Sequence, residues 1–408
     1  MADKPGGGAG FLRPSRVCYL AVISTAFWSM VFYAHHSAMQ GGTPMAAVLV
    51  RPSAFSRPLL TSFRIIAGGQ DRCAGRRVYM YEMPARFNAE LVRDCGMYST
   101  SMDVCKLVVN GGFGPALPGG GALPERDVYD TDQYMLELIY HARMRRYECL
   151  AGDASAADAA NPWKGVDFGV PFPSHFHPTS DADVLQWQDC MRRRDRRWLW
   201  AFAGAPRPGS SMTVRAQIIE QCTASPSCTH FGSSPGHYNS PGRIMELLES
   251  ATFCIQPRGD SYTRKSTFDS MLAGCIPVFL HPASAYTQYT WHLPRDYRTY
   301  SVFIPHTDVA GRNASIDERL RSIPPATVAR MREEVIRLIP RITYRDPAAT
   351  RVTFRDAFDV AVDAVLDRVA AAEGREYVDV FDGHDSWKHN LLEDGQTQIG
   401  PHEFDPYL

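Results

Sequence analysis

The sequence has almost no excess of charge of either sign. Its 43 lysines and arginines stand against 44 aspartates and glutamates, so the formal net charge is -1 over 408 residues. A chain so nearly neutral produces no long-range field that would attract nucleic acid or an acidic membrane, and we expect no nucleic-acid partner. Any anion-binding site must therefore be built locally. The densest basic run, Arg192–Arg197, is interpreted as a solvated helix face, with a phosphate or partner contact as the alternative.

Three familiar ligand-binding motifs are missing. There is no G-x-G-x-x-G and no G-x-x-x-x-G-K-[ST], which argues against a dinucleotide-binding Rossmann unit and a P-loop NTPase. There is also no C-x-x-C pair, which argues against a zinc site. Two Asp-x-Asp patterns, at 130–132 and 181–183, fall at expected helix starts, where acidic caps are the simpler explanation. We expect no metal and no cofactor.

Long hydrophobic runs are absent with one exception. Val17–Ala34 contains eighteen residues without a charge, which is just enough to span a bilayer. Basic residues precede it, so the positive-inside rule places residues 1–16 in the cytosol and the rest in the lumen. A cleaved signal peptide is the alternative, but the run is long for one and no clean cleavage site follows closely. We expect an uncleaved signal anchor at 17–34 and a stem over 35–76, which is rich in Gly, Pro, Ser and Arg.

The ten cysteines fit this topology. Nine of them follow the apolar run and would lie in an oxidising lumen. Because nine is odd, at least one cannot be in an intramolecular disulfide. Close spacing favours the pairs Cys95–Cys105 and Cys222–Cys228, while the sequence alone does not determine connectivity. Asn313 opens an N-x-S sequon, a glycosylation acceptor in the predicted lumenal part.

Strands and helices alternate along the rest of the chain, which is typical of an α/β protein with parallel sheets. A helix is predicted over 129–143 with Asp130 or Thr131 as its cap, and another begins at Ser180 with Asp183 three residues on. Parallel sheets bind ligands outside the carboxyl ends of their strands. The other predicted elements are strands at 77–84 and 198–204, a helix at 240–250, a strand, loop, helix and strand over 254–280, and helices near 326–339 and 352–372.

The loop and helix start inside 254–280 collect anion-binding groups. The N-terminus of a helix favours phosphate through its backbone N–H groups and its partial positive charge. Arg258, Arg264 and Lys265 can neutralise a diphosphate, and nearby hydroxyl groups can donate hydrogen bonds to it. Asp269 can accept hydrogen bonds from ribose hydroxyls. A capped helix with a solvated loop is the alternative interpretation.

Several stretches resemble the exostosin-like glycosyltransferases of family 47, and within them the plant xyloglucan galactosyltransferase group. The resemblance covers most of the chain from about Cys73 to Tyr344. It rests on the stretches Asp167–Pro178, Gln186–Gln188, Phe202–Pro208, Gly259–Phe279, Ser284–Pro294 and Tyr300–Pro305.

This resemblance implies a type II Golgi membrane protein with a GT-B fold, that is, a pair of Rossmann-like domains. The acceptor domain would span 77–197, the donor domain 198–345, and a C-terminal helix and tail 346–408. The implied reaction moves a sugar, most directly galactose from UDP-galactose, to xyloglucan or another cell-wall glucan with inversion at the anomeric carbon. Other Golgi glycosyltransferases are possible partners.

The resemblance also assigns the donor site and leaves the catalytic base open. An inverting transfer needs a base that takes the acceptor proton. Our candidates in the N-terminal part are His175, His177, Asp130, Asp132 and Glu82, each with a structural role as the alternative. A base in a stretch that family members carry and this chain lacks is the other alternative. The aromatic run Tyr286–His292 either stacks on a sugar or packs against the sheet. The implied donor-binding residues are Arg207, Arg215, Arg258, Asp260, Ser261, Arg264, Lys265, Ser266, Thr267 and Asp269.

One departure from the family pattern concerns the N-terminal domain. Family members carry a long stretch where this chain has only Ala151–Val166, and residues 77–197 contain few predicted strands for a doubly wound domain. We therefore expect an incomplete N-terminal domain. A non-catalytic Golgi paralogue that acts as a complex partner is the alternative function.

Overall fold

A computed structural model describes residues 71–97, 103–117, 128–153, 168–205, 214–232, 241–259, 261–311, 314–349 and 352–372. All of them belong to one compact unit, Gln70–Leu408. No helix in these ranges combines the length and the apolar character needed to cross a bilayer. The predicted anchor and most of the predicted stem lie outside the described residues.

A five-stranded parallel sheet forms the centre of the fold, in the order β2-β1-β3-β4-β5. Strands β3 and β4 are buried almost throughout and β1 is buried at residues 200–202, as expected when helices cover both faces of a parallel sheet. The sheet confirms the predicted α/β class. The strands are β1 Trp198–Ala203, β2 Cys228–Phe231, β3 Ala251–Gln256, β4 Ile276–Phe279 and β5 Val302–Phe303.

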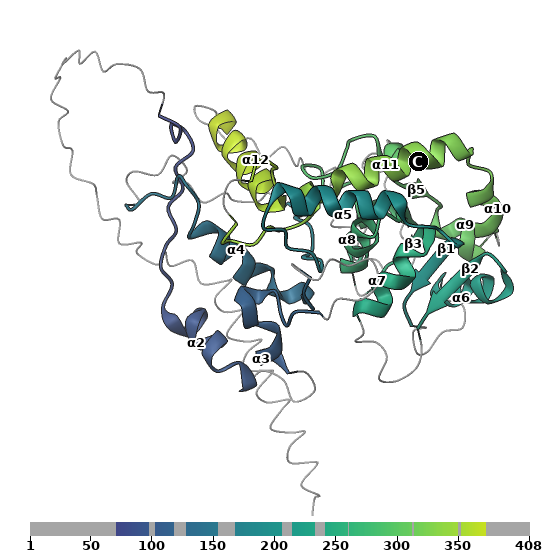
Figure 1. The fold of residues 1–408 in the computed structure, drawn as a ribbon, viewed down its shortest axis with the longest axis horizontal. Helices are drawn as coiled ribbons and strands as arrows, with labels where there is room; N and C mark the ends of the chain where they lie inside the picture. The colour runs from purple at the N-terminus through teal and green to yellow at the C-terminus, as the bar shows by residue number, and fades with distance from the viewer. Residues whose placement is uncertain are drawn as a thin grey trace, which may run out of the picture. The chain divides into compact units, whose positions relative to one another are not determined.

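Helices pack on both faces of this sheet (Figure 1). Side chains alternate along a strand, so Trp200 and Phe202 pack on the face covered by α6 and α10, while Ala201 packs with α5 and α7. Helices α5 and α11 lie side by side. The helices of this part are α5 Asp181–Arg193, α6 Val214–Ala224, α7 Pro241–Glu249, α8 Lys265–Leu272, α9 His306–Gly311, α10 Ile316–Arg321, α11 Pro325–Ile342 and α12 Ala357–Ala372.

Most of the predicted elements in this part are confirmed. The predicted strand, loop, helix and strand over 254–280 are β3, the loop after it, α8 and β4. The two predicted C-terminal helices are α11 and α12.

The described residues before 154 contain short helices and no strand. The predicted strand at 77–84 is wrong, because only Val78 pairs with another segment, through an isolated bridge to Leu150. Val78 packs against the core near Leu136–Met144 and α12, but Tyr81 and Met83 are 71% and 55% exposed. The helices here are α2 Ala89–Arg93, α3 Val104–Leu107 and α4 Leu136–Met144.

The predicted cap of the helix near 129–143 is also wrong. A 3-10 turn, Gln133–Met135, precedes α4, and the Asp132 carboxylate accepts from the backbone N–H of Tyr134 at 2.9 Å. Thr131 is buried and its hydroxyl donates to the carbonyl of Phe113. Asp132 therefore caps this turn, because its carboxylate lies next to the first N–H groups of the turn.

A buried ion cluster ties α4 to α12. The Arg143 guanidinium is 4% exposed and contacts the carboxylates of Asp356 and Asp359 at 3.3 and 3.0 Å. Removing the Arg143 guanidinium or its carboxylate partners would leave an uncompensated buried charge. The cluster fixes the N-terminal helices against the C-terminal part of the chain.

Four disulfides are present among the described residues. The two predicted pairs, Cys95–Cys105 and Cys222–Cys228, are confirmed. Cys73–Cys149 joins the start of the described chain to the end of the α4 region, and Cys254–Cys275 joins β3 to the residue before β4. Cys190 is the one described cysteine outside these bonds.

The predicted start of α5 at Ser180 is confirmed and gives a first prediction. The Ser180 hydroxyl accepts from the backbone N–H of Asp183, and the Asp183 carboxylate accepts from Ser180 and from Thr179 N–H. Ser180→Ala should lower the free energy of unfolding by about 1 kcal/mol, since it removes the cap. Ser180→Asn, which keeps a capping oxygen, is the control. Equal losses for both variants in urea unfolding would contradict this role.

Candidate active site

Arginine side chains gather where β1 and β3 end at the carboxyl edge of the sheet. Arg215 lies in the first turn of α6, and Arg258 and Arg264 lie in the loop between β3 and α8. The Arg215 guanidinium donates to the carbonyls of Arg258 and Ala205, both at 3.2 Å. These hydrogen bonds draw the two strand-end loops together.

Gly259 lies between two of these guanidinium groups. A Cβ atom at this position would be 2.9 Å from Arg264 Nη1 and 3.9 Å from Arg215 Nη2. A larger residue would therefore push the arginines apart. Neither Arg258 nor Arg264 forms an ion pair with a described residue; Arg258 lies over the Tyr262 ring at 5.0 Å. The result is a concentrated positive site that suits a phosphate-bearing ligand.

A hydrogen-bond chain from the end of β3 positions Arg264. Its Nε donates to the Ser266 hydroxyl at 3.2 Å, and that hydroxyl donates to Gln256 Oε1 at 2.7 Å. Arg264 has extended backbone at the N-cap of α8, and no side chain caps the helix. The positive end of the α8 dipole therefore lies beside the guanidinium of Arg264.

Lys265 and Asp269 pair with each other across one turn of α8. The Lys265 ammonium contacts the two Asp269 oxygens at 2.8 and 3.0 Å, and Asp269 also accepts from the Ser174 hydroxyl at 2.7 Å. Asp269 is 5% exposed. In this structure the pair therefore faces protein, whereas the sequence leads to the expectation that both residues contact the donor.

His175 completes this buried cluster from the segment before α5. Its Nε2 lies 3.0 Å from the Lys265 ammonium, so Nε2 accepts, and Nδ1 donates to the carbonyl of Tyr129 at 2.9 Å. Burial, and then the Lys265 charge, lower the pKa of His175 to about 4. The neutral ring has both nitrogens engaged, which leaves no nitrogen for an acceptor hydroxyl. The cluster ties this segment to α8.

His177 has a structural environment. The side chain is fully buried and its ring stacks on Phe113 at 3.7 Å between centroids. Nδ1 lies 2.7 Å from the carbonyl of Tyr344 and Nε2 2.8 Å from the Thr131 hydroxyl. Burial lowers its pKa to about 3. His177 therefore holds its segment to the C-terminal part and does not face an open surface.

Among the other base candidates, Asp132 caps the 3-10 turn and Glu82 is exposed and pairs with Arg145 at 3.6 Å, whereas Asp130 has a different environment. Its backbone N–H donates to the carbonyl of Pro115 at 2.8 Å, but its half-buried carboxylate forms no hydrogen bond with a described residue. Burial raises its pKa, and the nearby Lys265 charge opposes that shift. A half-exposed carboxylate with a raised pKa, close to the start of α8, has the properties of a general base.

The other predicted residues differ in accessibility. Ser261 is exposed and donates to the carbonyl of Thr263 at 2.9 Å. Thr267 is 1% exposed, so its hydroxyl does not face a ligand surface. Arg207, Asp260 and Asn313 lie outside the described residues.

Sequence reasoning missed Ser174 and the Tyr262–His281 pair. Ser174 precedes the two histidines, and only its contact with Asp269, 95 residues away, reveals its role. The Tyr262 ring contacts the His281 ring at 4.1 Å between centroids, below the Arg258 guanidinium. No spacing in the sequence indicates either contact.

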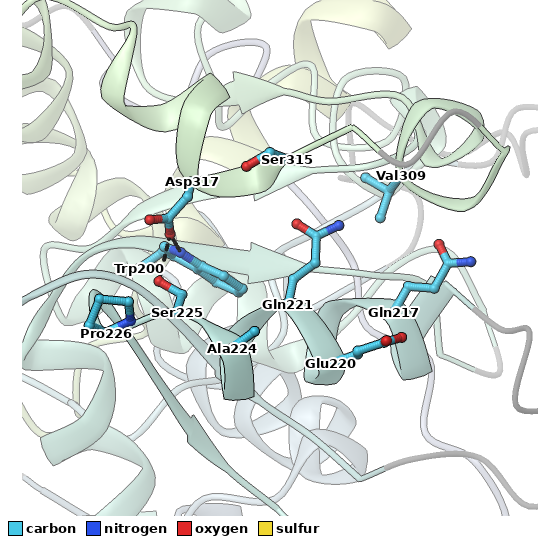
Figure 2. Close-up of a pocket in the computed structure, with 10 residues that line it drawn as sticks. All are labelled: Trp200, Gln217, Glu220, Gln221, Ala224, Ser225, Pro226, Val309, Ser315 and Asp317. Carbon is cyan, nitrogen blue, oxygen red and sulfur yellow. Dashed lines mark hydrogen bonds between the residues drawn. The ribbon is translucent and has the colours of Figure 1, made fainter.

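A cavity of about 590 Å³ lies away from these residues, between α6 and α10 (Figure 2). Asp317 points toward Trp200 and accepts from its indole N–H and from the hydroxyls of Ser225 and Ser227. Ser225 and Ser227 precede β2, so this end of the cavity is at the amino edge of the sheet. We give the arginine site more weight, because parallel sheets bind ligands at the opposite edge.

The fold and this site define a class, namely α/β proteins with a cationic site at the carboxyl edge of a parallel sheet. Comparison of the sequence with known protein families identifies the family of this chain. The Exostosin GT47 domain model matches residues 72–160 and 158–320. The chain therefore belongs to the exostosin GT47 family, and it is a glycosyltransferase.

Similar proteins of Arabidopsis thaliana extend this finding. Xyloglucan galactosyltransferase MUR3 is 39% identical over 86% of this chain and 72% of its own length. Probable xyloglucan galactosyltransferase GT15 is 35% identical over 75% of this chain and 85% of its own. Xyloglucan-specific galacturonosyltransferase 1 is 30% identical over 73% of this chain and 58% of its own.

The comparisons also bear on the predicted gap in the N-terminal domain. The two family matches meet at residues 158–160, inside Ala151–Val166. The alignment with MUR3 covers 448 positions, more than the 408 residues of this chain, so that relative contains insertions which this chain lacks.

Proposed function

We propose that this chain moves galactose from UDP-galactose to a xyloglucan side chain, with inversion and without a metal. The names of its relatives supply the acceptor and the first donor to test. The observation that carries the proposal is that the Arg215 and Arg264 guanidinium groups flank Gly259, in the same loop that carries Arg258 over the Tyr262 ring. Three guanidinium groups beside a helix N-terminus can balance the charge of a departing UDP, which other enzymes balance with a metal ion.

Asp130 is the proposed base. In an inverting transfer the acceptor hydroxyl attacks the anomeric carbon, the bond from that carbon to the UDP oxygen breaks, and the base takes the hydroxyl proton. The electron pair of the broken bond leaves with UDP, where Arg258 and Arg264 stabilise the new charge. Lys265, Asp269 and His175 would hold α8 and the Asp130 segment in register.

The setting is part of the same proposal. We place the chain in the Golgi membrane as a type II protein, with the 17–34 anchor and a lumenal body of GT-B type whose N-terminal domain is shortened. Four disulfides are consistent with an oxidising lumen. Glycosylation at Asn313 would follow from that location. Other Golgi glycosyltransferases remain the proposed protein partners.

The test is a transfer assay with the full-length chain produced in a secretory host. UDP-galactose, UDP-galacturonic acid and UDP-arabinose are each offered with xyloglucan oligosaccharides, and the product is identified by mass and anomeric configuration. We expect galactose transfer that survives chelation of divalent metals. Transfer of another sugar, or with retained configuration, would contradict the proposal.

The two-piece family match favours a second candidate, a non-catalytic partner that lacks part of the acceptor domain. Such a chain would bind UDP in calorimetry but transfer no sugar from any of the three donors. It would also co-purify with an active glycosyltransferase from the same membrane. Transfer by the purified chain alone would exclude this candidate.

A further inference from the structure

The aromatic run Tyr286–His292 divides into buried anchors and one accessible ring. Tyr286, Tyr289 and His292 are 5%, 2% and 0% exposed, so the packing interpretation holds for them. Trp291 is only half-buried. Its ring pairs with that of Phe168 at 4.4 Å between centroids, with an angle of 36° between the planes, and Phe168 is 49% exposed.

The backbone under Trp291 is held rigidly from the protein side. Arg341 donates to the carbonyl of Trp291 at 2.7 Å and to that of His292 at 3.4 Å. The His292 ring is buried and its Nε2 lies 3.0 Å from the carbonyl of Ala357. A tryptophan fixed in this way loses little conformational entropy when a ligand binds to it.

Phe168 reaches Trp291 because Gly169 allows a close approach. The Gly169 N–H donates to the carbonyl of Gln288 at 3.1 Å, and a Cβ on Gly169 would lie 2.5 Å from that oxygen. On another side, the Arg368 guanidinium of α12 lies 4.7 Å from the centre of the Trp291 ring. Three separate segments thus build one surface, which we call the Phe168–Trp291 platform.

This platform adjoins the candidate active site. The Tyr289 ring packs on Phe268 in α8 at 4.8 Å between centroids, and the Tyr289 hydroxyl lies near the Thr263 side chain of the β3–α8 loop. Trp291 is two residues further along the same turn. A ligand on the platform would therefore lie next to the loop that carries Arg258 and Arg264.

We infer that the Phe168–Trp291 platform binds the glucan backbone of the acceptor. A pyranose ring presents a face of C–H groups that stacks on the electron-rich face of an aromatic ring. Phe168 is 49% exposed and offers that face, while Trp291 backs it, with the Arg368 guanidinium over the Trp291 ring. The Arg368 guanidinium, near the ring, can donate hydrogen bonds to sugar hydroxyls. Exposed apolar rings near a polar edge are typical of ligand-binding surfaces. This inference rests on the proposed function for the identity of the acceptor.

The experiment measures binding of a xyloglucan oligosaccharide and of UDP to the full-length chain by calorimetry. Trp291→Ala should weaken oligosaccharide binding by about tenfold or more, since it removes the ring that supports Phe168, and leave UDP binding unchanged. Phe168→Ala removes the exposed ring itself and should give a comparable loss. Trp291→Phe should keep most of the affinity.

Trp198→Ala is the matched control, since Trp198 is also half-buried, with Arg197 at 4.9 Å from its ring. It should not affect oligosaccharide binding in protein that melts normally. Unchanged oligosaccharide affinity in both platform variants would overturn the inference. Loss of UDP affinity in a platform variant would also overturn the inference, because it would indicate that the platform binds the nucleotide. A platform variant that changed only the oligomeric state of the protein would overturn it too.

The two hypotheses fail in different ways. Oligosaccharide binding that depends on Trp291 in a chain that transfers no sugar would contradict the proposed function and support the platform. Sugar transfer that is insensitive to Trp291→Ala would contradict the platform and leave the proposed function in place.

Discussion

Replacing Arg264 by alanine should lower kcat/KM for UDP-galactose by about 100- to 1,000-fold, the loss typical when one preorganised donor to a developing negative charge is removed. The guanidinium is held by Ser266, lies within reach of Gly259 and forms no ion pair with a described residue. It is thus available to the diphosphate before and during bond cleavage. Steady-state kinetics with the full-length enzyme at varied UDP-galactose would measure the loss.

Two further variants make this result specific. Arg264→Lys keeps the charge but loses the planar fork, so we expect intermediate activity. Arg298→Ala is the control, because Arg298 is exposed and pairs with Asp296 at 2.8 Å outside the site. If Arg264→Ala kept wild-type activity, or if Arg298→Ala lost as much, the diphosphate would not be bound where we place it.

The donor-domain elements could be predicted from the sequence because their signals are local. Continuous apolar runs mark β1 and β3, and Ser180 with Asp183 marks the start of α5. The strand at 77–84 has a similar local pattern but no sheet to join, and strand formation depends on a partner. Whether a partner strand is present depends on the tertiary structure, which a local sequence pattern does not encode.

The candidate site shows the same division. The arginine site could be predicted because cations between the end of a strand and the start of a helix typically bind an anion. Lys265 and Asp269 are four residues apart, a spacing that permits the i, i+4 ion pair observed on α8, whereas the sequence-based prediction assigns both residues to the donor. The contacts of His175 with Lys265 and Tyr129 could not be predicted from the sequence, because those residues lie 90 and 46 positions away along the chain. Asp130 stands out only once the structure shows that His175, His177, Asp132 and Glu82 are engaged by other residues.

Asp130→Asn should lower kcat by about 100- to 10,000-fold, the range that general base catalysis supplies, with little change in KM for UDP-galactose. The amide is nearly the same size as the carboxylate but cannot take the acceptor proton. Asp132→Asn is the matched control from the same turn, because Asp132 caps the 3-10 turn and contacts no residue of the arginine site. It should cost stability and leave kcat nearly unchanged.

The pH dependence of kcat gives an independent test of this base. Asp130 must be deprotonated to act, and burial raises its pKa above the ordinary aspartate value. Wild-type activity should therefore fall as the pH decreases through that raised pKa, at a higher pH than an exposed aspartate would give. The residual activity of Asp130→Asn should lack this acidic limb. A limb that persists in the variant would mean that another group, outside the described residues or on the acceptor side, takes the proton.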